Sequence, residues 1–141
     1  MEPFLVRIYK PLSLALAGVF AAVGLLFLLI PVGVVGFFNG LSGPLGFRPS
    51  PAGVPDFFLV LAVAYMVVVT FLSWSMFRHP GDASFPRILA VAKVSSSALS
   101  FLLFFLQAPY LMYLTNAVVD GLIGVVAILC VVALRRRAAA R

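Results

Sequence analysis

Hydrophobic residues gather in four long runs, separated by three gaps that hold most of the prolines. The runs cover residues 12–30, 57–77, 88–106 and 110–134. A helix needs about 20 apolar residues to cross the hydrocarbon core of a bilayer, which is roughly 30 Å thick. Each run is of that order, so the pattern predicts an all-α integral membrane four-helix bundle, formed as a single transmembrane domain over residues 1–141.

The gaps predict how these helices are joined. Pro31 ends the first run, and the apolar stretch 32–38 either continues as a kinked helix or lies at the membrane interface; we favour the interface. The rest of the 31–56 gap is rich in glycine and proline, which predicts an irregular loop. In the gap 78–87, Asp82 or Ser84 is a candidate cap for the third helix. Pro109 disfavours helix just before it, so the last two runs form a tight antiparallel hairpin.

Composition supports lipid as the solvent for much of the chain. Hydrophobic residues make up 64% of the sequence and charged residues 10%, against roughly 25% charged in soluble domains. The net charge of +6 does not indicate nucleic acid, because four of the ten basic residues follow the last run within the final seven positions. Such a placement is typical of a juxtamembrane anchor.

Basic residues also predict the orientation, since cytoplasmic loops carry an excess of Lys and Arg. One side of the predicted bundle has Arg48 alone, and the other has eight basic residues: Arg7, Lys10, Arg78, Arg87, Arg135, Arg136, Arg137 and Arg141. We therefore expect both termini and the 78–87 loop in the cytoplasm, and the 31–56 loop outside, in a bacterial inner membrane. The first run is longer than the apolar region of a signal peptide, so we interpret it as a retained span.

Polar residues inside the last two runs form a candidate site. A charge within the bilayer costs roughly 2.5–3.5 kcal/mol on insertion scales, so the intramembrane Lys93 and Asp120 need a partner or a function. The third run places its polar residues at i, i+3, i+4 and i+7, and the fourth at i, i+4, one helix face in each case. The hairpin turns these faces toward each other. The predicted intramembrane polar site comprises Lys93, Ser96, Ser97, Ser100, Asn116 and Asp120.

Three roles are open for this site. It is a structural network that fixes one bundle arrangement, a site for a ligand or proton built on a desolvated Asp120 carboxylate, or a contact with another subunit. Side chains lean toward the N-terminus of their own helix, which carries Lys93 and Asp120 apart. The two backbones differ in height by roughly 7 Å, which is within reach of a lysine side chain. The sequence therefore leaves open whether the two charges pair directly or through serine, asparagine or water.

Small residues predict where helices approach closely, because small-xxx-small faces let membrane helices pack. The first run has Gly18 and Ala22 at i, i+4, and the fourth has a similar stripe formed by Ala117, Gly121 and Gly124. On the second run, Tyr65, Thr70, Ser73 and Ser75 are candidates to line the bundle interior, although serine and threonine also bond to carbonyls of their own helix.

The sequence gives no positive sign of an enzyme. It contains no P-loop, GxGxxG, HExxH or GxSxG motif and no paired catalytic carboxylates. Its single cysteine, Cys130, and single histidine, His79, build neither a disulfide nor a metal site, and we expect no cofactor.

The layout resembles the DoxX-like group of small four-span bacterial membrane proteins. The resemblance is carried by the first run leading into the Pro/Gly-rich outward segment, the FRHPGDASFPR turn, Lys93 in the third run and the NAVVDG stretch in the fourth. It implies a membrane partner of redox or stress-response systems, and it carries over no functional residue.

We expect a non-enzymatic accessory or interaction protein, a small subunit or partner of a larger membrane assembly. Very short loops and the lack of a catalytic constellation favour this function. The alternative is a small transporter or a protein that binds a lipophilic ligand at the intramembrane Asp/Asn/Lys site. The expected partners are the lipid bilayer and other membrane subunits or further copies of this chain, and no nucleic acid.

Overall fold

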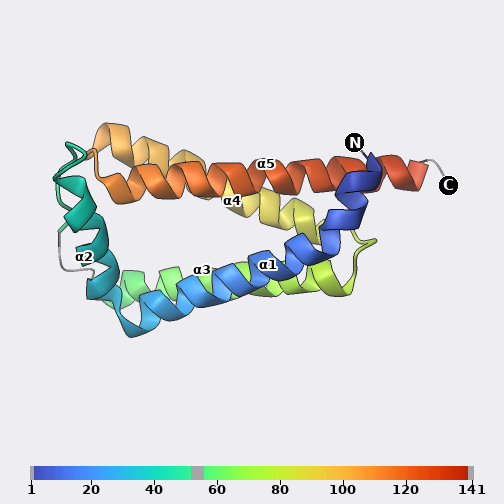
Figure 1. The fold of residues 1–141 in the computed structure, drawn as a ribbon, viewed down its shortest axis with the longest axis horizontal. Helices are drawn as coiled ribbons and strands as arrows, with labels where there is room; N and C mark the ends of the chain where they lie inside the picture. The colour runs from blue at the N-terminus through green and yellow to red at the C-terminus, as the bar shows by residue number, and fades with distance from the viewer. Residues whose placement is uncertain (1, 52–55, 140–141) are drawn as a thin grey trace.

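The computed structural model describes residues 2–51 and 56–139, which form five helices (Figure 1). These are α1 (Glu2–Leu29), α2 (Pro31–Ser42), α3 (Asp56–Arg78), α4 (Ser84–Leu106) and α5 (Leu111–Ala139). Within the described residues, α1, α3, α4 and α5 are long and apolar enough to span a membrane. The all-α class is confirmed, and the four candidate membrane-spanning helices indicate a multi-pass membrane protein. Residues 52–55 of the predicted loop and the terminal Arg141 lie outside the described residues.

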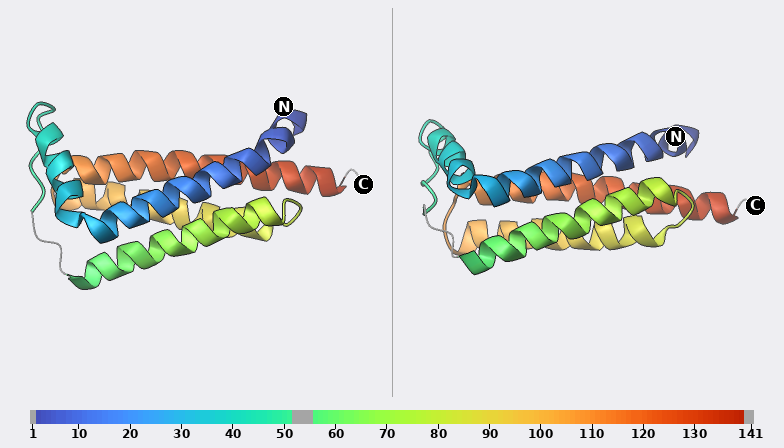
Figure 2. Two further views of the ribbon diagram at one scale, coloured as in Figure 1. Left: turned by 60° about the horizontal axis from the view of Figure 1, so that its bottom comes forward. Right: turned by 90° about the horizontal axis from the view of Figure 1, so that it is seen from below.

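The long helices are arranged as two antiparallel pairs, with α1 along α3 and α4 along α5 (Figure 1). Figure 1 shows that the pairs lie close together at the end where α1 begins and α5 ends, and diverge toward the end that holds α2. Figure 2 shows the same helices from two further directions. We call these the termini end and the α2 end. The bundle is therefore tight at one end and open at the other.

Helix α2 lies across the open end of the bundle, at a steep angle to the other helices (Figure 1). The chain bends at Ile30, whose non-helical φ and ψ are −137° and 52°. Pro31 explains the bend, because proline restricts the residue before it and fits the first turn of a new helix. The stretch 32–38, for which the sequence favoured an interfacial segment over a kinked continuation of the helix, is thus helical.

The loop after α2 is tied down by a reciprocal pair of hydrogen bonds. The Asn39 side chain donates to the Ser50 carbonyl at 2.9 Å and accepts from the Ser50 amide at 2.7 Å. Between them, Gly46 has a φ of 75°, a left-handed conformation that glycine adopts without steric cost. Arg48 then pairs with Tyr110 in an isolated bridge, which joins the loop to the start of α5.

The hydrophobic core lies in the half of the bundle near the termini end. All four long helices contribute to it, and its buried members are Tyr9, Phe20, Val69, Leu72, Met76, Leu89, Ala90, Ala127 and Cys130. Cys130 is a free, buried thiol and fills space in this core. The core holds α1, α3, α4 and α5 together in the part of the bundle where the two pairs lie close to each other.

The turn between α3 and α4 is closed by Asp82. Its Oδ1 accepts a hydrogen bond from the Ser84 backbone N–H at 2.8 Å, at the start of α4. The sequence proposed Asp82 or Ser84 as the cap, but the cap position of α4 is Ala83, which makes no side-chain cap hydrogen bond. Asp82 lies one residue earlier and closes the turn that leads into the helix through its hydrogen bond with Ser84. This hydrogen bond stabilises the carboxylate and holds the pKa of Asp82 below its ordinary value.

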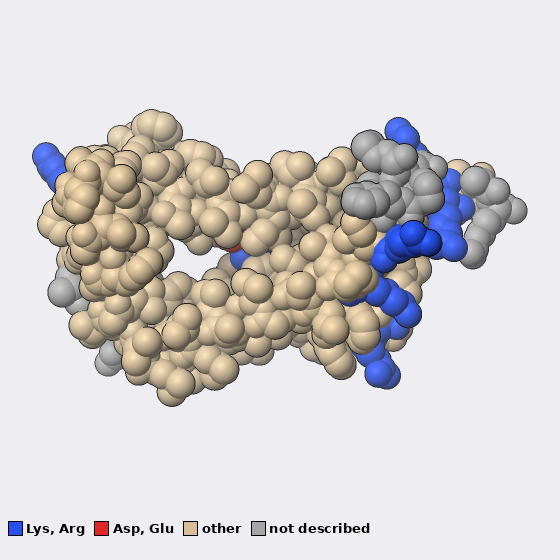
Figure 3. Space-filling model, viewed as in Figure 1, with Lys and Arg blue, Asp and Glu red and all other residues tan. Residues whose placement is uncertain are grey.

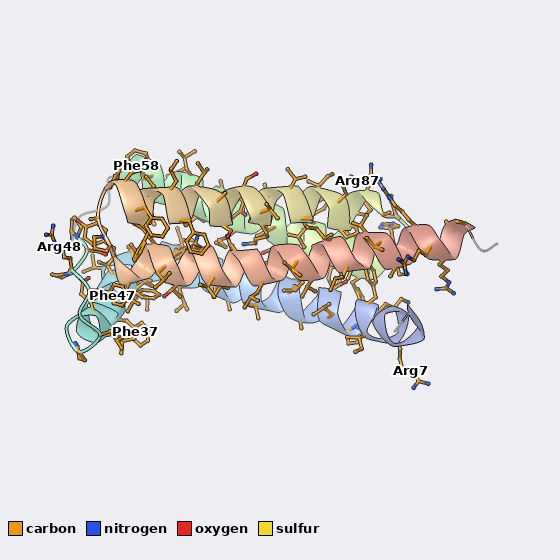
Figure 4. The ribbon with its side chains drawn as sticks, turned by 90° about the horizontal axis from the view of Figure 1, so that it is seen from above. Arg7, Phe37, Phe47, Arg48, Phe58 and Arg87 are labelled. Carbon is orange, nitrogen blue, oxygen red and sulfur yellow. The ribbon has the colours of Figure 1, made fainter. Side chains whose placement is uncertain are left out.

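Basic side chains separate by end. Figure 4 shows Arg7 and Arg87 at the termini end and Arg48 at the α2 end. The space-filling view in Figure 3 shows further Lys and Arg side chains gathered at the termini end. The long apolar sides between the two ends carry almost no charge in that view.

Candidate functional site

Helices α4 and α5 face each other through polar side chains, as the spacing predicts. Asn116 on α5 donates from Nδ2 to Ser100 Oγ at 2.7 Å and to Ser96 Oγ at 3.2 Å. Between these two serines along α4, Ser97 donates to the Ala117 carbonyl at 2.6 Å. The structure therefore brings these predicted site residues together in a ladder between the two helices.

Small residues on α5 allow this close approach. A Cβ added to Gly121 would lie 2.9 Å from Ser97 Oγ, and one added to Gly124 would lie 2.9 Å from Val94 Cγ2. Ala117, on the same face, is fully buried. These distances are shorter than van der Waals contact, so Gly121 and Gly124 set how closely the helix axes approach.

Lys93 and Asp120 form a buried ion pair. Lys93 Nζ donates to Asp120 Oδ1 at 2.8 Å, and the two side chains are 1% and 6% exposed. The sequence left open whether the two charges pair directly, because the backward lean of side chains favours separation. The structure has direct contact, since the long lysine side chain spans the offset between the two backbones and α4 and α5 pack closely at Gly124.

The lysine also contacts the other helix pair. Its Nζ lies 4.4 Å from the ring centroid of Phe20 on α1 and 5.0 Å from that of Tyr65 on α3. Both distances suit attraction between a cation and an aromatic face. Tyr65 in turn donates from its hydroxyl to the Ala92 carbonyl of α4 at 3.3 Å. Lys93 thus connects all four long helices at one point.

The ion pair leaves one oxygen without a partner. Asp120 Oδ2 is buried and has no hydrogen bond to the described residues. Because Lys93 contacts Oδ1, the two opposite charges balance each other. The unpaired Oδ2 is therefore part of a neutral ion pair and not of an isolated buried anion.

A cavity of about 430 Å³ lies between α1, α2 and α5, on the α2 side of the ion pair. We call it the α2-side cavity. Its wall is largely apolar and includes Phe27, Phe37 and Phe38, and its polar members are Thr115 and Asn116. Figure 3 shows an opening between the helix pairs beside α2, with atoms of a basic and an acidic side chain visible at its inner end.

The predicted small-residue face of α1 does not contact another described helix of this chain. Gly18 and Ala22 are both exposed, and a Cβ added to Gly18 would meet nothing within 4 Å. The face of α1 that turns inward instead carries Ser13, Ala17, Phe20 and Gly24. Gly24 makes the close approach to α3, where its added Cβ would lie 3.0 Å from Met66 Cβ.

Two residues that matter for the site were not singled out in the sequence. Phe20 is one of many apolar residues in its run, and Thr115 precedes Asn116 without any pattern of its own. A signal for Phe20 does exist in Ser13, the one polar side chain of the first run. Ser13 is buried and bonds to the Tyr9 carbonyl at 2.7 Å, so its helix face points to the bundle interior, and Phe20 lies on that face.

No metal centre is formed by the described residues, among which no group of three His, Cys, Asp or Glu side chains lies close together. His79 is exposed in the turn between α3 and α4, where its ring stands 5.8 Å from that of Phe85. These positions leave the α4–α5 ladder, the ion pair and the α2-side cavity as the candidate site.

Comparison with known proteins adds no relative to this description: no family model, curated protein or solved structure matches the chain. The resemblance to DoxX-like proteins stays a prediction.

Proposed function

We propose that this chain is an inner-membrane protein that binds a lipophilic molecule in the α2-side cavity. The observation that carries the proposal is the cavity itself, with a volume of about 430 Å³ and a largely apolar wall interrupted by Thr115 and Asn116. Small-molecule sites are typically clefts of about 300–1,000 Å³ with apolar walls and a few placed polar groups. The cavity fits that description. It lies beside α1 and α5, two of the helices proposed to span the membrane, in which lipophilic molecules dissolve.

The ion pair does not line the cavity, and it supports the proposal by joining the four long helices at one point. Lys93 holds α5 through Asp120 and holds α1 and α3 through the rings of Phe20 and Tyr65. Beyond this point toward the termini end, the bundle is filled by the hydrophobic core. A packed core at that end suits binding of a ligand better than its passage along the helices through the protein.

The orientation completes the proposal. With the basic termini end in the cytoplasm, α2 and the α2-side cavity lie toward the outer face of a bacterial inner membrane. A single cysteine placed at Leu45 in a Cys130→Ala background is then expected to react with a membrane-impermeant maleimide on spheroplasts, and a cysteine at Ala138 only after lysis. The reverse labelling pattern would contradict this orientation.

The binding proposal is tested by photolabelling of the purified full chain with hexadecanol that carries a diazirine. We expect saturable labelling of α1, α2 and α5 residues around the cavity. Val119→Trp, which fills the cavity from its α5 wall, is expected to abolish the saturable part. Val125→Trp is the matched control, because Val119 and Val125 lie on the same helix and are 48% and 54% exposed.

Labelling that rises linearly with probe concentration on every apolar face would show only surrounding lipid and would contradict the proposal. Equal saturable labelling of the Val119→Trp and Val125→Trp proteins would contradict it as well, since the site would then lie elsewhere.

The accessory-subunit function stays a prediction beside this one. It is tested by the native mass of the chain extracted in mild detergent at natural expression, where other polypeptides in one particle would support it. A particle that contains this chain alone would count against it.

A further inference from the structure

We infer that the ligand of the α2-side cavity carries a neutral hydroxyl head group on an apolar tail, as in a long-chain or isoprenoid alcohol. The inference rests on the proposed binding function and adds the chemistry that the wall recognises. It follows from which hydrogen-bonding atoms of the wall are occupied within the protein and which are free.

Asn116 offers an acceptor. Both hydrogens of its Nδ2 are used, because this atom donates to Ser96 Oγ and to Ser100 Oγ. Its Oδ1 has no hydrogen bond to the described residues, and the side chain stands in the cavity wall. A ligand atom that meets this oxygen favourably has to donate a proton, as a hydroxyl does and a ketone or an ether does not.

Thr115 offers the second contact. Its hydroxyl also makes no hydrogen bond to the described residues, and it lines the same cavity from the position next to Asn116. A threonine hydroxyl both donates and accepts. A ligand hydroxyl can therefore donate to Asn116 Oδ1 and accept from Thr115 Oγ1, whereas an ether or ketone satisfies one of the two at most.

Charge excludes an ionised head. The described wall residues include no acidic or basic side chain. The nearest charges, Lys93 and Asp120, neutralise each other at 2.8 Å. An ammonium or carboxylate head would enter a largely apolar cavity without a counter-charge, at a high desolvation cost. A neutral hydroxyl meets no such penalty once both of its hydrogen bonds are made.

The apolar part of the wall receives the tail. Leu26 and Phe27 of α1 and Phe37 and Phe38 of α2 surround the cavity on the sides away from Asn116. The resulting contacts are non-directional, so they favour a hydrocarbon chain without selecting its exact length.

The test measures competition against the diazirine hexadecanol probe on the full chain. The competitors are hexadecanol, hexadecyl methyl ether and hexadecylamine, which share a tail and differ in the head. We expect hexadecanol to compete about tenfold better than the ether, as loss of one or two hydrogen bonds implies. The amine is expected to compete no better than the ether.

Two variants locate the head group. Thr115→Val keeps the shape of the side chain and removes the hydroxyl, and Asn116→Leu removes the amide. Each is expected to bring the alcohol and the ether within about threefold of each other, with ether binding unchanged. Thr70→Val is the matched control, since Thr70 lies on α3 outside this cavity and bonds to the Met66 carbonyl at 2.7 Å.

The outcomes separate the inference from the function on which it rests. Equal competition by alcohol and ether, stronger competition by the amine, or a preference that survives in both Thr115→Val and Asn116→Leu would overturn the hydroxyl assignment while leaving the cavity as a binding site. Absence of saturable labelling of the cavity by the probe would overturn both.

Discussion

The two halves of the helix bundle pack in different ways. Near the termini end, α1, α3, α4 and α5 share one core, in which Val69 and Leu89 are fully buried and Met76 is nearly so. Near the α2 end, the helix pairs diverge (Figure 1), and the α2-side cavity lies between α1, α2 and α5. The half near the termini end thus has a packed interior, and the half near the α2 end surrounds a cavity.

The difference follows from where small residues lie. Gly121 and Gly124 let α4 and α5 meet closely, and Gly24 lets α1 meet α3. Past Gly24, toward the α2 end, α1 continues with large side chains such as Phe27, and Pro31 then turns the chain away. Membrane helices lack a hydrophobic force that would close such a gap, because lipid tails are as apolar as the side chains. The open half can therefore persist.

The ion pair lies at the boundary between the halves, and substitutions of its two residues are expected to lower the stability of the protein most. Lys93→Met or Asp120→Leu leaves the partner charge buried and unpaired, which should lower the free energy of unfolding by about 3–5 kcal/mol. The double variant Lys93→Met/Asp120→Leu removes both charges and should recover most of the loss. The measurement is the unfolding midpoint of each protein in an SDS titration from mild detergent.

A double variant as unstable as the singles would mean that the hydrogen-bonded geometry, rather than charge balance, holds the boundary. Retention of saturable photolabelling in a folded double variant is also expected, since neither residue lines the cavity.

Truncations compare the two halves directly. Leu89→Ala removes a fully buried side chain from the core, and we expect a loss of about 2–5 kcal/mol in the same titration. Leu26→Ala, in the cavity wall, removes a side chain that is 48% exposed, and its cost should be well below that of Leu89→Ala. Similar costs at the two positions would contradict the division into a packed and an open half.

Enlarging glycine tests the cause of the tight packing. Gly124→Leu places side-chain atoms where Val94 Cγ2 stands 2.9 Å from an added Cβ, and overpacking of this kind costs about 1–3 kcal/mol. Gly18→Leu is the matched control, because an added Cβ there meets nothing within 4 Å. A Gly124→Leu protein as stable as the Gly18→Leu protein would show that glycine does not set the α4–α5 approach.

Much of the fold follows from the sequence, and for a clear reason. A bilayer demands about 20 apolar residues per helix, so run lengths alone locate the four spans. Polar spacing in the last two runs was also informative, because residues such as Asn116 and Ser100 have few partners inside a membrane other than each other. Their hydrogen bond at 2.7 Å follows from the hairpin.

The rest depends on geometry that one-dimensional patterns do not contain. Gly18 and Ala22 satisfy the i, i+4 small-residue pattern, whereas Ala17 and Gly24 lie seven residues apart. The rotation of α1 about its axis nevertheless turns Ala17 and Gly24 inward and leaves Gly18 and Ala22 exposed. The α2-side cavity likewise depends on how far the helix pairs diverge. No local spacing encodes that angle, so the site's largest feature could not be predicted.

The smallest change in stability is expected from a substitution in the turn that joins α3 to α4 at the termini end. The Ser84 N–H holds the pKa of Asp82 below its ordinary value of 3.8, so its contribution to stability is complete above that value and is lost as the pH falls through the lower folded pKa. Asp82→Asn keeps an acceptor for Ser84 and removes the titration. Between pH 7 and pH 2, the thermal midpoint of the wild-type chain should therefore fall slightly more than that of Asp82→Asn. The comparison cancels the titration of the other carboxyl groups. Because Asp82 is exposed to solvent, a large difference would mean that this turn, rather than the buried core, keeps the termini end closed.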